Sequence, residues 1–280
     1  MKSPSFPLAR FAALFLFIGA PMANAELPSL STAPWVGFFA GLDSKTYRLG
    51  ISARGEINLN PWHKKGAVHA YHFIPVTWGI ERTLPDGRTR VFEVLPDSLE
   101  SDDQANSELE TTIIRGETTG GAKVELTVTE DDGVMHFKTR LLDPGQLPAD
   151  SIRPVICTLV QNYYGTTKAR MSSKPDEFLE LLEDNKDSLK LTQVDGKTKK
   201  FDFIEPVTAA SDEVTGAGVT EAEVDVRFID HTYIFAATGA SALTLENKEG
   251  EPFHAGFKMV WRADEAKDAK HEATLAISVK

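Results

Sequence analysis

The chain has 280 residues, of which 41% are hydrophobic and 25% are charged, and its 30 Lys and Arg stand against 41 Asp and Glu. An apolar fraction of this size excludes a disordered or collagen-like chain. The net charge of −11 argues against nucleic acid as a partner, because contact with phosphates needs clustered basic side chains.

The first 25 residues are typical of a secretory signal peptide. Lys2 and Arg10 supply a positive start, an apolar run follows at 11–20, and an Ala-Asn-Ala cleavage motif ends at Ala25. The apolar run is too short to span a bilayer, and no comparable run of about 18 residues follows it, so no membrane span is expected after cleavage. We therefore expect cleavage after Ala25, a mature chain of net charge −13, and a secreted or periplasmic location.

Apolar and polar residues alternate through much of the mature sequence. Apolar side chains recur at every second position in the segments 122–129, 135–141, 221–228 and 275–279, where only Thr139 departs from the pattern, and this spacing places them on one face of a strand. Turn dipeptides that tolerate positive φ separate such segments, namely Asp86-Gly87, Gly120-Gly121, Asp132-Gly133 and Asp195-Gly196. The pattern predicts an all-β fold, a large antiparallel β-sandwich of about fifteen strands in a hairpin meander.

Two segments depart from this pattern. Ser173 and Pro175 are typical of a helix start, and leucines follow at helical spacing, so we expect one short α-helix near 175–187 packed against the sandwich. The Gly-containing loop at 211–220 could mark a subdivision of the chain. Because the part after it would have a thin core of its own, we expect a single domain over 26–280.

The richest group of chemically active side chains lies between Asn60 and Phe73. It contains Trp62, His63, His69 and His72. On a strand, His69 and His72 point to opposite faces, so only two of the three histidines could converge. Their spacing matches no zinc motif, and we expect no metal. A groove containing these histidines and a hairpin with exposed histidines are both compatible with the sequence.

Aromatic side chains suggest a second kind of site. Large aromatics with polar neighbours often form platforms for sugar rings, and Trp62, Tyr163 and Tyr164 are the candidates here. Trp78 and Trp261 lie within strand patterns that predict core positions. The single cysteine, Cys157, lies in an apolar strand segment and is expected to be a buried thiol.

The sequence contains no nucleophile elbow, zinc-protease motif, phosphate loop or dinucleotide fingerprint, and no cofactor is expected. We therefore expect a secreted or periplasmic soluble β-sandwich protein that binds a glycan or another small molecule, or acts as a scaffold. The alternative is a carbohydrate-active enzyme, a lyase, hydrolase or isomerase, whose groove contains His63, His69 and His72. An assembly subunit that pairs through an edge strand or the 175–187 helix is a third interpretation. The sequence leaves the oligomeric state open.

Overall fold

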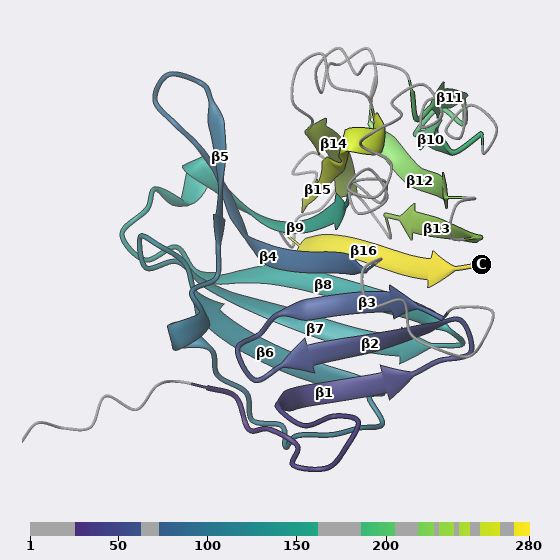
Figure 1. Cartoon of the computed structure of the whole chain (residues 1–280). Coiled ribbons are helices and arrows are strands. Elements are labelled where there is room, and N and C mark those ends of the chain that lie inside the picture. The colour runs from purple at the N-terminus through teal and green to yellow at the C-terminus, as the bar shows by residue number, and fades with distance from the viewer. Residues whose placement is uncertain are drawn as a thin grey trace, which may run out of the picture.

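The computed structural model describes residues 26–62, 73–161, 186–204, 218–226, 230–237, 241–246, 253–263 and 272–280. The predicted signal peptide, nearly all of the predicted 175–187 helix and most of the 211–220 loop lie outside these ranges. Within them the chain forms two eight-stranded antiparallel sheets that stack face to face (Figure 1). The prediction of an all-β sandwich is confirmed.

The first sheet combines a local meander with strands from the second half of the chain. Its spatial order is β1 (Phe38–Asp43), β2 (Tyr47–Ser52), β3 (Ile57–Pro61), β4 (Ile74–Thr83), β9 (Ile152–Val160), β15 (Phe257–Ala263) and β14 (Ser241–Glu246), and β5 (Thr89–Glu93) also pairs with β4. The strands β1, β2, β3 and β4 pair in chain order, whereas β9 joins β4, and β15 joins β9, through long connections.

The second sheet is arranged in the same way. Its spatial order is β11 (Thr198–Asp202), β10 (Ser188–Gln193), β12 (Val219–Val226), β13 (His231–Ala236), β16 (Glu272–Val279), β8 (Val134–Asp143), β7 (Lys123–Asp131) and β6 (Thr111–Glu117). Short 3-10 turns complete the described chain at η1 (Pro96–Ser98), η2 (Ala149–Ser151) and η4 (Phe253–Ala255). No α-helix occurs among the described residues.

The core lies between the inner faces of the two sheets. Val124, Leu126 and Val128 of β7 are fully buried and alternate with side chains on the outer face, as the sequence pattern predicts. Trp78 and Trp261 are also buried, so their predicted core positions are confirmed. A single contiguous cluster of buried apolar side chains joins the two sheets.

Candidate functional site

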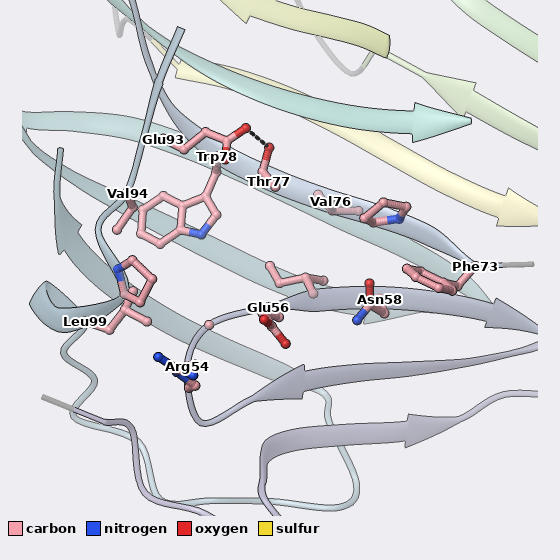
Figure 2. Close-up of a pocket in the computed structure, with 14 residues that line it drawn as sticks. Arg54, Glu56, Asn58, Phe73, Val76, Thr77, Trp78, Glu93, Val94 and Leu99 are labelled. Atoms are coloured by element: carbon pink, nitrogen blue, oxygen red, sulfur yellow. Dashed lines mark hydrogen bonds between the residues drawn. The ribbon is translucent and has the colours of Figure 1, made fainter. Parts of the chain in front are cut away.

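A cleft opens in the first sheet where β4 changes its neighbour along one edge. Residues 74–76 of β4 pair with β3, whereas residues 79–83 pair with β5. The opposite edge of β4 stays paired with β9 from Val76 to Arg82. The sheet therefore divides between β3 and β5 and leaves a cleft of about 400 Å³ between them (Figure 2).

Gly79 allows the two chain segments beside the cleft to approach closely. A Cβ atom at this position would lie 2.1 Å from the backbone oxygen of Phe92, so no larger residue fits without movement of the backbone. The amide of Val94 donates a hydrogen bond of 3.1 Å to the backbone oxygen of Trp78, which fixes the end of β5 beside β4.

The cleft has an apolar base and a polar rim. Trp78, Val94 and Leu99 supply apolar surface from β4, the end of β5 and the residues after η1 (Figure 2). Arg54, Glu56 and Asn58 line the opposite wall from β3 and the turn before it. Trp78 and Leu99 are almost fully buried, so the base is closed, whereas the guanidinium, the carboxylate and the amide of the opposite wall are more accessible.

A hydrogen-bonded pair occupies the boundary between the cleft and the outer face of the sheet. The Thr77 hydroxyl donates to Glu93 Oε1 at 2.9 Å (Figure 2), and Lys258 Nζ lies 3.8 Å from the same oxygen. The Glu93 side chain is 51% exposed and Thr77 is half-buried. The hydrogen bond holds the hydroxyl and the carboxylate side by side at this boundary.

Farther along β4, a buried ion triad connects three neighbouring strands of this sheet. Glu81 of β4 is 1% exposed and accepts hydrogen bonds from Arg153 of β9 at 2.8 Å and from Arg262 of β15 at 2.9 Å. Burial raises the pKa of Glu81, but the two guanidinium groups outweigh this effect, and the pKa lies below its ordinary value. The triad links β4, which carries Thr77, to β9 and β15.

The chemistry of the cleft suits binding of a small polar molecule that has an apolar face. Aromatic and aliphatic surface combined with a few placed polar groups is typical of ligand pockets, and sugars present this combination. Within the ranges that the structure describes, no three His, Cys, Asp or Glu side chains are grouped to hold a metal ion.

The structure describes one of the six ligand-binding residues predicted from the sequence. Trp62 is half-buried at the end of β3, where its indole nitrogen donates to the backbone oxygen of Ser44 at 2.8 Å. Trp62 does not line the cleft. The other five lie outside the described residues and stay predictions: His63, His69, His72, Tyr163 and Tyr164.

Sequence reasoning did not find the residues that line the cleft. Glu93 is one of 41 acidic residues, and Thr77 is a strand residue whose neighbours are apolar, so neither has a distinctive motif. The alternation in β4 does carry a signal, because Thr77 lies on the opposite face from the buried Val76 and Trp78. That signal predicts the face of the sheet on which Thr77 lies. It does not reveal that β4 changes its partner from β3 to β5, which opens the cleft.

No family model matches the chain, and no curated protein matches it. Solved structures share its arrangement of strands. The α-N-acetylgalactosaminidase NagBb from Bifidobacterium bifidum, solved with GalNAc, superposes with a TM-score of 0.49 at 10% identity, covering 86% of this chain and 36% of that one. The chain thus spans about a third of that enzyme's length.

Two shorter proteins are covered almost completely. A galactose mutarotase-like protein from Lactobacillus casei superposes with a TM-score of 0.40 at 12% identity, covering 86% of this chain and 98% of that one. A galactose mutarotase related enzyme from Lactobacillus acidophilus gives 0.40 at 9% identity, with 86% and 96% covered. The likeness is limited to the arrangement of the strands. Across the described part of the chain, no helix is both long and apolar enough to cross a membrane.

Proposed function

We propose that this protein binds a sugar in the cleft between β3, β4 and β5. The observation that supports the proposal is that the partly exposed Phe73 ring, the Asn58 amide and the Thr77–Glu93 pair line one open cleft. Its volume of about 400 Å³ falls within the ~300–1,000 Å³ of small-molecule pockets. The cleft is formed by strands of a stable sheet, so it is present before the ligand arrives.

We further propose that binding takes place outside the cytoplasm. The support for this part is the predicted signal peptide at 1–25 and the structure just after it. Leu27 is buried, and its amide donates a hydrogen bond of 2.9 Å to the backbone oxygen of Ala53. The chain is thus packed against the folded domain from the second residue after the predicted cleavage site.

Titration calorimetry of the mature protein against a panel of mono- and disaccharides tests sugar binding. Thr77→Val removes the hydroxyl that contacts Glu93 and keeps the shape of the side chain. We expect it to weaken binding about tenfold, because the cleft loses one hydroxyl and the Glu93 carboxylate loses the hydrogen bond that holds its position. Thr127→Val, at a half-buried position of β7 in the other sheet, is the matched control and should leave the affinity unchanged.

Two results would contradict the proposal. The first is the absence of binding across the whole panel, and the second is an equal loss of affinity in Thr77→Val and Thr127→Val. Proton NMR of the same mixtures shows whether any bound sugar is converted, and product formation would support the carbohydrate-active enzyme predicted as the alternative.

A further inference from the structure

A second hollow lies beside the cleft on the outer face of the first sheet. It has a volume of about 260 Å³ and is bounded by β4, β9 and β15. Pro75, Thr77 and Glu93 line both the hollow and the cleft. The two spaces therefore share a boundary, and a molecule held at this boundary can extend into both.

The floor of the hollow is apolar. Leu159 of β9 lies opposite Lys258 of β15, and its side chain is 41% exposed although its strand is central in the sheet. Cys157, two residues earlier on the same face, is buried, and Pro75 adds apolar surface from β4. The hollow is thus a patch of aliphatic surface in a position where a sheet usually presents polar side chains.

The charged and hydroxyl groups of Thr77, Glu93 and Lys258 line the hollow and meet at the Glu93 carboxylate. Thr77 donates to Glu93, and Lys258 lies 3.8 Å from the same carboxylate. A hydroxyl-rich ring placed over Leu159 would lose water without gaining partners, which costs free energy. An alkyl or aryl group placed there would instead gain from the removal of apolar surface from water.

We propose that the hollow receives an apolar substituent, an alkyl or aryl group, of the sugar that the cleft binds. This inference rests on the proposed function, because the sugar ring must be held in the cleft beside Thr77 and Glu93. From there its substituent crosses the Thr77–Glu93 boundary and covers Leu159. The expected ligand is therefore a glycoside with an apolar aglycone rather than a free monosaccharide.

Titration of the mature protein with methyl, butyl and hexyl glucopyranosides and galactopyranosides tests this inference. We expect the affinity to rise by about fourfold for each methylene that enters the hollow. Leu159→Asn places a polar side chain on the floor and should abolish the rise, while the methyl glycoside keeps its affinity. Leu142→Asn is the matched control, since Leu142 is 44% exposed and lies away from both spaces.

The outcomes separate this inference from the proposed function. Glycosides that bind with one affinity whatever their chain length would overturn the inference and leave sugar binding intact. A rise with chain length that persists in Leu159→Asn would also overturn it, because the apolar group would then lie elsewhere. Binding of none of the glycosides would overturn both proposals. Thermal unfolding of each variant, at a midpoint equal to that of the unmodified protein, confirms that the fold is retained.

Discussion

A single arginine contacts the rings of two tryptophans, Trp35 and Trp62. The Arg48 guanidinium lies 4.9 Å from the ring centre of Trp35 and 5.1 Å from that of Trp62. Asp43 accepts two hydrogen bonds from the same guanidinium, at 2.6 and 2.8 Å. The ring of Trp62, the only described member of the predicted platform, is therefore already in contact with a cation.

We predict that Arg48→Lys lowers the free energy of unfolding by about 1–2 kcal/mol, because lysine keeps the charge but loses the planar contact with the rings and the paired hydrogen bonds. Chemical denaturation measures the loss, and tryptophan fluorescence should shift because the surroundings of two indoles change. Arg88→Lys is the control. Arg88 pairs with Asp86 and is 80% exposed, so we expect little change. Equal losses in the two variants would show that the rings contribute nothing.

At the scale of strands, the Glu81 triad has a defined pH dependence. Because the folded protein holds the pKa of Glu81 below its ordinary value, the ionised form contributes stability above the ordinary pKa. That contribution is lost as the pH falls through the lower pKa of the folded state. The strands β4, β9 and β15 should therefore separate more easily in acid than at neutral pH.

We predict that Glu81→Gln destabilises the protein by about 3 kcal/mol at pH 7, since it leaves the buried Arg262 and the half-buried Arg153 without their carboxylate. Urea denaturation at pH 7 and pH 3 checks this, and the difference between variant and unmodified protein should shrink in acid. Glu110→Gln, at an exposed position, should have no measurable effect at either pH. An undiminished difference at pH 3 would contradict the assignment.

Most strands could be predicted from the sequence because the two faces of each strand meet different surroundings. In β12, for example, Val224 and Val226 face the core and Glu223 and Asp225 face outward. β1 shows no such alternation, because Phe39, Ala40 and Gly41 are buried in succession. The Trp35 ring lies directly against Gly41, and a Cβ atom at this position would be only 2.4 Å from the ring.

The site was harder to predict than the strands for a related reason. Pairing between β4 and β5 spans a short hairpin and follows from the turn at Gly87. The approach of β15, which brings Lys258 toward Glu93, joins residues 165 positions apart. The alternation predicts the face of the sheet on which a side chain lies. Which strands lie beside it depends on the order of strands in the sheet, and no local pattern encodes that order.

At the scale of the whole molecule, the predicted signal peptide has a direct test. We predict that protein recovered from the periplasm or the culture medium begins at Glu26, because the cleavage motif ends at Ala25. Intact mass and N-terminal sequencing check this. Ala25→Arg should block processing, while Glu26→Gln should leave it unchanged. Full-length protein retained inside the cell would contradict the predicted export.

The division of the sheet beside β4 has a consequence for how such a protein can diversify. The cleft exists because the backbone of β4 pairs first with β3 and then with β5. The side chains line its walls but do not create it. Arg54 and Glu56 line the cleft and are exposed, so replacing either would alter the ligand preference without closing the cleft. Ligand preference can therefore change through these side chains while the stability of the fold is retained.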